Sequence, residues 1–224
     1  MARTSAAHFT EVIRQRIGED FLRVGRVGEY LKRNTAAVDR FVLETAHACG
    51  LDELELAVAA VGGYGRSEMF PYSDIDVLVL VRSYNDKLKA AVEAFVTDLW
   101  ELGLTVGSAV RTSDEMIAAC KEDISVATAF MEARFLLGDK RLFEETHARY
   151  RKTLDKRVFF RSKMLEMRQR HQRYDETPYA LEPNVKESPG GLRDLQVFLW
   201  CARCAGFGKN WKELAQSGLI TETE

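Results

Sequence analysis

The stretch VGGYGRSEMFPYSDIDVLVLV, residues 61–81, decides the fold. It begins with a glycine pair, continues with two aspartates separated by one residue, and ends in an unbroken apolar run. The run from Ile75 to Val81 follows turn residues and is rich in Val, Leu and Ile, which predicts a buried strand. Because side chains alternate along a strand, Asp74 and Asp76 are expected to point to the same face. The sequence thus predicts two neighbouring carboxylates at the mouth of a buried strand.

Two carboxylates this close repel each other, so one would take up a proton unless a cation lay between them. Mg²⁺ suits such a pair, because it binds a few carboxylate oxygens and completes its shell with water and phosphate oxygens. A bare D-x-D is also compatible with a polar strand start whose aspartates only cap the turn. The glycine pair eleven residues upstream favours the metal interpretation.

Gly62 and Gly63 end another predicted strand, ELAVAAV at residues 55–61. Glycines there let backbone N–H groups approach a triphosphate, and the start of a helix would favour the negative charge. Arg66 is placed to reach the same phosphates with its planar guanidinium. An ordinary tight turn would explain the glycines alone. Together with the D-x-D strand, however, they predict a site that holds a metal-bound nucleotide by positioning and charge neutralisation.

The rest of the chain is predicted to be mostly helical, with one more strand. Helical periodicity covers residues 8–50 and 87–102, and in the second segment we expect Leu99 and Trp100 to lie in the core. A third strand is predicted over 104–111. Further helices are expected over 113–121, 124–137, 140–152, 155–173 and 192–205, with an ordered loop over 175–191.

This order of elements predicts an α+β fold, in which a small mixed-sheet domain is followed by an all-α helical unit. At 224 residues the chain is long enough for one domain with its own core and a smaller unit behind it. We expect N-terminal helices over 1–54, the sheet domain over 55–138 and the helical unit over 139–224.

Composition argues against several classes of protein. The formal net charge of −2 leaves no excess of Lys and Arg to neutralise phosphates, so no nucleic-acid partner is expected. Apolar stretches of signal-peptide or membrane-span length are absent from the sequence, so we expect a cytoplasmic protein without a membrane partner. Cys201 and Cys204 form a lone C-x-x-C, which without a second pair indicates reduced thiols rather than a metal knuckle.

The pattern G-G-(x)₁₀-D-x-D is similar to the signature of the DNA polymerase β-like nucleotidyltransferase superfamily. The fuller text GGYGRSEMFPYSDIDVLVL resembles the nucleotidyltransferase domain of the bacterial PII uridylyltransferase/uridylyl-removing enzymes. RHQRYDETPYALEPNVKESPGGLRDL, residues 170–195, resembles the helical segment that follows it in that family. LWELGLTVGSAVRT (99–112) and ISVATAFMEARFLLGD (124–139) fit as well, so the resemblance covers about residues 55–205.

The resemblance implies transfer of UMP from UTP to a tyrosine of the nitrogen-regulatory protein PII, with release of pyrophosphate. Asp74 and Asp76 would then bind Mg²⁺. The residues that would contact the triphosphate are Gly62, Gly63, Arg66 and Ser73, with Arg111, Lys186 and Arg193 as further candidates. Arg111 is equally compatible with a surface salt bridge, and Lys186, Arg193 and Asp194 with the capping of a helix rather than a nucleotide contact. For His171 a solvated helix face is expected.

The sequence departs from the family pattern at two points. Many members of the superfamily carry a third carboxylate on a neighbouring strand, but residues 104–111 contain no acidic residue. Ser108 stands where the family often has a histidine, and Asp114 could substitute for the missing carboxylate or belong to a helix start. The family is also longer, with phosphohydrolase and glutamine-sensing domains, so we expect the helical unit to be truncated and unable to remove UMP.

Two alternatives stay open. A related adenylyltransferase shares the D-x-D, although Phe70-Pro71 before the aspartates and Gln196 after Asp194 argue for the uridylyltransferase. The second alternative is an inactive nucleotide-binding regulatory module, suggested by the missing third carboxylate. A comparison of UTP with ATP as the nucleotide donor distinguishes the adenylyltransferase from the uridylyltransferase. Nucleotide binding without transfer to any acceptor would support the inactive module.

Overall fold

The computed structural model of the chain describes residues 15–101, 105–179 and 181–221. The chain divides into two compact units, Met1–Tyr150 and Arg151–Glu224. The first holds a four-stranded mixed sheet with helices, and the described part of the second is helical, which confirms the α+β class. The predictions for residues 8–14 and 102–104 lie outside the described residues.

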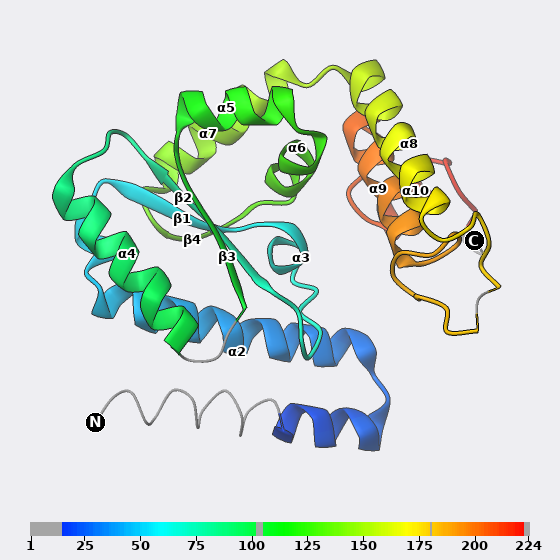
Figure 1. Cartoon of the computed structure of the whole chain (residues 1–224), viewed down its shortest axis with the longest axis horizontal. Helices are drawn as coiled ribbons and strands as arrows, with labels where there is room; N and C mark the ends of the chain where they lie inside the picture. Colours follow the sequence, from blue (N-terminus) through cyan, green and yellow to red (C-terminus); the bar gives the residue numbers. More distant parts are fainter. Residues whose placement is uncertain (1–14, 102–104, 180, 222–224) are drawn as a thin grey trace. The chain divides into compact units, whose positions relative to one another are not determined.

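The sheet has the strand order β3-β2-β1-β4 (Figure 1). Its strands are β1 (Leu56–Ala60), β2 (Ile75–Val81), β3 (Val106–Thr112) and β4 (Arg134–Gly138). β1 is antiparallel to both β2 and β4, whereas β2 and β3 run parallel. β1 and most of β2 are buried on both faces, which is why both read as nearly unbroken apolar runs in the sequence.

Alternate residues of β2 pack against different layers of helices. Ile75, Val77, Val79 and Val81 belong to the hydrophobic core that also contains side chains of α2 (Val27–Ala48) and α4 (Asp86–Glu101). Each such fully buried side chain contributes about 2 kcal/mol. Asp76, Leu78 and Leu80 point to the opposite face of the sheet. That face carries α5 (Ser113–Glu122), α6 (Ile124–Met131) and α7 (Lys140–Thr153) (Figure 1).

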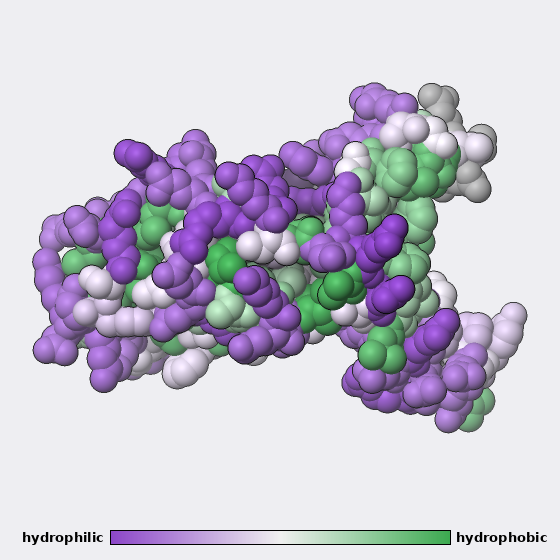
Figure 2. Space-filling model, turned by 90° about the horizontal axis from the view of Figure 1, so that it is seen from above, coloured by the Kyte–Doolittle hydropathy of each residue, from purple (hydrophilic) through white to green (hydrophobic). Residues whose placement is uncertain are grey.

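Short elements and caps join these layers. η1 (Leu51–Glu53) leads into β1, and α3 (Gly62–Gly65) lies between β1 and β2. The predicted helix start after β3 is confirmed. The Thr112 side chain accepts from the Glu115 N–H, and Glu115 accepts from the Thr112 N–H, which is a capping box. The surface over α5 and α7 is mostly hydrophilic, as expected for helices with one face toward solvent (Figure 2).

The predicted helix over 124–137 is wrong in its second half. α6 ends at Met131, and β4 then pairs with β1. Local periodicity cannot reveal a strand whose stabilisation comes from a partner more than seventy residues earlier in the chain. The helix expected next, α7, lies mostly in the first compact unit, which extends to Tyr150.

Trp100 is the second correction. Leu99 lies in the core as expected, but the Trp100 side chain is 57% exposed. Its indole N–H donates to the Val106 carbonyl at 3.2 Å, so the ring lies along the edge of the sheet instead of under it.

The second unit contains α8 (Lys156–Gln172), α9 (Leu192–Ala205) and α10 (Trp211–Gln216). The Lys163 side chain of α8 is buried, donates to Glu166 at 2.6 Å and lies over the Trp200 ring. Cys201 and Cys204 on α9 are free thiols, and burial raises the pKa of Cys204 to about 11.

Within the described part of the chain, none of the helices is long and apolar enough to cross a membrane.

Candidate nucleotide and metal site

The glycine turn after β1 is held beside the start of β2. The Val61 N–H donates to the Asp76 carbonyl at 3.0 Å, which fixes where the turn begins. A second turn, which leads from α3 into β2, is closed by Ser73. The Ser73 N–H donates to the Phe70 carbonyl at 3.1 Å, and the Ser73 hydroxyl accepts from the Phe70 N–H at 3.0 Å. The short helix expected after the glycines is present as α3, but four residues make too little helix for a substantial dipole.

The Asp76 carboxylate lies between two glycines from different elements. Gly62 has a φ of +58°, and a Cβ there would lie 3.1 Å from Asp76 Oδ2. Gly107 is the register partner of Asp76 on β3, and a Cβ there would lie 2.5 Å from Asp76 Oδ1. A side chain at either position would therefore crowd the carboxylate. The two glycines keep the space around Asp76 free of side-chain atoms of their own.

Asp74 immediately precedes β2, and its side chain is exposed. It lies outside the strand, so strand alternation does not determine where it points, and the shared face of the two aspartates stays a prediction. Among the described residues, no group of three or more His, Cys, Asp or Glu side chains is placed to hold a metal. A metal at this point would take its protein ligands from the D-x-D pair and its remaining ligands from water and phosphate.

Arg66, predicted to contact phosphate, is engaged with two carboxylates. Its Nε donates to Glu68 at 2.7 Å, and its Nη1 forms a very short contact with Glu132. Burial lowers the pKa of Arg66, but the Glu132 and Glu68 carboxylates outweigh that effect and raise it, so the guanidinium stays charged. The side chains of Arg66 and Glu132 are 18% and 5% exposed. The pair therefore ties the end of the glycine turn to the connection between α6 and β4.

A second ion pair supports the turn from the side of α2. Arg134 of β4 donates from Nη1 and Nη2 to the two carboxylate oxygens of Asp39, at 2.8 and 2.9 Å. It also donates to the Tyr64 carbonyl at 3.3 Å, and its guanidinium lies 5.4 Å from the centre of the buried Tyr64 ring. In the segment between α3 and β2, the Met69 carbonyl accepts from Asn34 Nδ2 of α2 at 2.7 Å. Both sides of the glycine turn are thus anchored to α2.

β3 does not bring all of its predicted site residues to Asp76. Arg111 pairs with Leu80, four positions beyond Gly107, which is about 13 Å along the strand. Ser108 pairs with Val77, so its side chain points to the face opposite Asp76. Asp114 forms an ion pair with Arg149 at 2.6 Å, and Thr112 rather than Asp114 caps the helix, so the role of Asp114 as a substitute carboxylate stays a prediction. The phosphate role of Arg111 stays a prediction.

The second unit holds the candidates from the GGLRD segment. Lys186 is exposed, whereas Arg193 donates to Gln196 at 2.8 Å and to Glu187 at 3.2 Å. Asp194 accepts from the Gly190 N–H at 2.7 Å and from His171 Nε2 at 2.9 Å. The expected solvated position of His171 is wrong, because its side chain is 23% exposed and joins the end of α8 to the start of α9.

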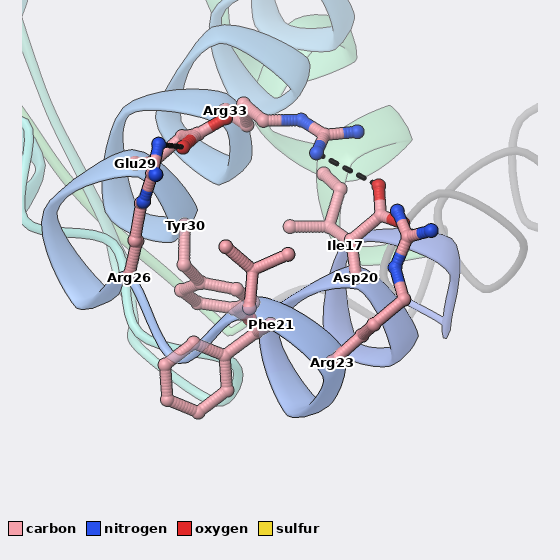
Figure 3. Close-up of a pocket in the computed structure, with 9 residues that line it drawn as sticks. Ile17, Asp20, Phe21, Arg23, Arg26, Glu29, Tyr30 and Arg33 are labelled. Carbon is pink, nitrogen blue, oxygen red and sulfur yellow. Dashed lines mark hydrogen bonds and ion pairs between the residues drawn. The ribbon is translucent and has the colours of Figure 1, made fainter.

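A separate pocket lies between the helical residues 15–24 and α2 (Figure 3). It is lined by Ile17, Asp20, Phe21, Arg23, Val24, Arg26, Glu29, Tyr30 and Arg33. Arg33 donates to Asp20 at 2.8 Å, and Arg26 lies 3.7 Å from Glu29, so the charges of the lining are largely paired with each other. None of the residues around the D-x-D belongs to this pocket.

Two residues of the site were missed from the sequence. Gly107 is the first of these, and a glycine near the start of a predicted strand is a signal of close approach that could have identified it. Glu132 is the second. It lies in a segment that was predicted to be a continuous helix, so its position at the end of α6 opposite Arg66 was hidden by the wrong element.

Comparison with known proteins finds two family models that together match residues 48–224 and overlap over residues 158–172. The model of the nucleotidyltransferase domain family matches residues 48–172, and that of the family described as GlnD PII-uridylyltransferase matches residues 158–224. A bifunctional uridylyltransferase/uridylyl-removing enzyme of Cupriavidus pinatubonensis is 48% identical over 213 residues, covering 94% of this chain and 24% of that protein. An enzyme with the same name from Burkholderia thailandensis is 51% identical over 189 residues, covering 84% and 22%. The chain spans about a quarter of the length of these relatives.

Proposed function

Because this chain belongs to the nucleotidyltransferase domain family, we propose that it transfers UMP from UTP to a tyrosine hydroxyl of the nitrogen-regulatory protein PII and releases pyrophosphate. The match of its C-terminal part to the GlnD PII-uridylyltransferase family supports this nucleotide and this acceptor. The names of the similar proteins support the same choice. The proposal concerns transfer alone, since the chain spans about a quarter of those relatives.

The observation that carries the proposal is the position of the Asp76 carboxylate between Gly62 and Gly107. Its two oxygens face space that a side chain at either glycine would fill, and carboxylate oxygens are the ligands that Mg²⁺ prefers. We assign Asp74 and Asp76 as the residues that would hold Mg²⁺. When bound, the ion supplies charge stabilisation on the transferring phosphoryl group and on the departing pyrophosphate.

The backbone of the glycine turn is the proposed cradle for the triphosphate. Gly62 and Gly63 present no side chain to the phosphates, and Ser73 holds the chain as it returns to Asp74. The bonds of Arg66 to Glu68 and Glu132 fix the turn in place, and its contact with phosphate stays a prediction. The polypeptide thus contributes mainly positioning and charge, which is what phosphoryl-type transfer requires of it.

The nucleophile comes from the acceptor. The tyrosine oxygen forms a bond to the α-phosphorus of UTP while the bond from that phosphorus to the bridging oxygen of the leaving pyrophosphate breaks, and the phenolic proton passes to water. β3, Val106–Thr112, contributes no acidic side chain to this step. The carboxylates of the D-x-D pair therefore carry the metal-dependent part of the site in this proposal.

The test is transfer of label to PII from UTP or from ATP, each labelled at the α-phosphate and supplied with Mg²⁺. We expect label from UTP on a tyrosine of PII, located by mass spectrometry, and loss of at least about a thousandfold in rate for Asp76→Asn. Label from ATP alone would make the chain an adenylyltransferase. Binding of UTP without transfer would indicate an inactive regulatory module.

A further inference from the structure

The outer edge of β3 carries backbone groups that do not face β2. β3 is the last strand of the sheet on its side. The Ile75 N–H donates to the Thr105 carbonyl at 2.8 Å, which sets the alternation of the parallel ladder. Odd-numbered residues of β3 therefore direct their N–H and C=O groups toward β2. Even-numbered residues, from Val106 to Thr112, direct theirs away from the sheet.

Two aromatic side chains occupy parts of this edge and leave its middle open. The Trp100 indole donates to the Val106 carbonyl at 3.2 Å, and the Tyr84 hydroxyl donates to the Val110 carbonyl at 3.3 Å. Both rings are about half exposed, at 57% and 54%. Ser108 lies between them, and in the part of the chain that the structure describes nothing bonds to its outward N–H and C=O.

Between these two aromatic side chains, the edge lacks the usual protection against an added strand. Natural edge strands are commonly blocked by lysine, proline or a bulge. Residues 106–110 read VGSAV and contain neither lysine nor proline, and the pairing of β3 with β2 runs without a register shift. An edge that is open in its middle, with an exposed donor and acceptor there, is suited to a short extended peptide segment, which pairs by its main chain.

We propose that an extended segment of the acceptor protein, carrying the tyrosine to be modified, adds as a strand to the outer edge of β3 and pairs with Ser108. This rests on the proposed function, because the acceptor is the partner whose tyrosine must reach Asp76. An added strand would lie about 4.8 Å from β3 and about 10 Å from β2. On the sheet face that carries Asp76, β3 presents the small residues Gly107 and Ala109. The side chain of the acceptor tyrosine would therefore pass over these two residues to reach the Asp76 carboxylate.

The pairing is tested by two substitutions at one position. Ser108→Pro removes the outward N–H without removing a bond to β2, and Ser108→Ala keeps the backbone while removing only the hydroxyl, which points away from Asp76. We expect kcat/KM for PII to fall at least about tenfold in Ser108→Pro and to stay within about twofold in Ser108→Ala. The shift in unfolding temperature on addition of UTP, which reports UTP binding, should be the same in both variants and in the unsubstituted chain.

A measurement on the unsubstituted chain covers the case in which Ser108→Pro fails to fold. Amide hydrogen exchange at Ser108 should slow when PII is added, because the docked strand would accept from that N–H. Unchanged exchange, or equal labelling of PII by both variants, would overturn edge docking while leaving the proposed function in place. If the unsubstituted chain transfers neither UMP nor AMP to PII, the proposed function and edge docking are both wrong.

Discussion

Gly107 is the position at which the smallest change should have the largest effect on the site. A methyl group there would lie 2.5 Å from Asp76 Oδ1, too close for the carboxylate to keep its position. Gly107 does not need a left-handed backbone, so alanine should fold normally and act through that contact alone. We expect Gly107→Ala to lower the rate of UMP transfer about a hundredfold, because displacement of about 1 Å at a reacting centre has an effect of that size.

The control for this prediction is the unfolding midpoint in urea, which should change little between Gly107→Ala and the unsubstituted chain. Transfer at a near-normal rate in a folded Gly107→Ala variant would mean that the position of the Asp76 carboxylate is not critical. The assignment of Asp76 as a metal ligand would then lose its structural support.

Single residues were predicted unevenly, because some are positioned by their neighbours in sequence and others by partners far along the chain. Asp76 could be identified because its neighbours in sequence form the strand and the turn that position it. Arg66 could be placed near the turn, but its partner Glu132 is 66 positions away and no local pattern links them. His171 was expected in solvent because a histidine among charged residues gives no sign of a carboxylate partner on another helix.

At the scale of elements, Asp194 links the end of α8, the loop before α9 and the first turn of α9. Burial raises the pKa of Asp194. Hydrogen bonds from His171 and the Gly190 N–H, with the positive charge of Arg170, outweigh burial and lower the pKa below its usual 3.8. The unfolded chain therefore binds the proton more readily than the folded one. The stabilisation is complete above pH 3.8 and is lost as pH falls through the lower folded pKa.

The variant Asp194→Asn should show this dependence directly. We expect it to lower the free energy of unfolding by about 2 kcal/mol at pH 6, because charged hydrogen bonds to the carboxylate are lost. The difference should shrink as pH falls from 3.8 through the lower folded pKa, where the native carboxyl also becomes protonated. Urea denaturation at a series of pH values, followed by circular dichroism, measures both effects. A difference that stays constant with pH would show that the carboxylate charge contributes nothing.

Elements with a strong local pattern were predicted well, and those that depend on distant partners were not. β2 and α9 agree with their predicted bounds because an apolar run and a helix start bound each of them in the sequence. β4 was missed, since a short half-buried strand after a helix is stabilised by pairing with β1 rather than by its own residues. The sheet that positions Asp76 was therefore predictable in its centre and not at the β4 edge.

At the scale of the whole molecule, the candidate residues are divided between two compact units. Asp74, Asp76 and the glycines belong to the first, and Lys186 and Arg193 belong to the second. Arg193 is held by Glu187 and Gln196, so its replacement would disturb the second unit itself. Lys186 is exposed and gives the cleaner test of whether the second unit contributes charge to nucleotide binding.

Lys186→Ala should weaken UTP binding about tenfold and leave the unfolding of both units unchanged, because one charge-assisted hydrogen bond to phosphate is lost. Calorimetric titration with Mg²⁺ and UTP measures the affinity. Lys209→Ala is the matched control, since Lys209 is also exposed and lies in the same unit. Equal affinity in both variants would contradict the predicted nucleotide contact of Lys186. Selective loss of affinity in Lys186→Ala would support that contact.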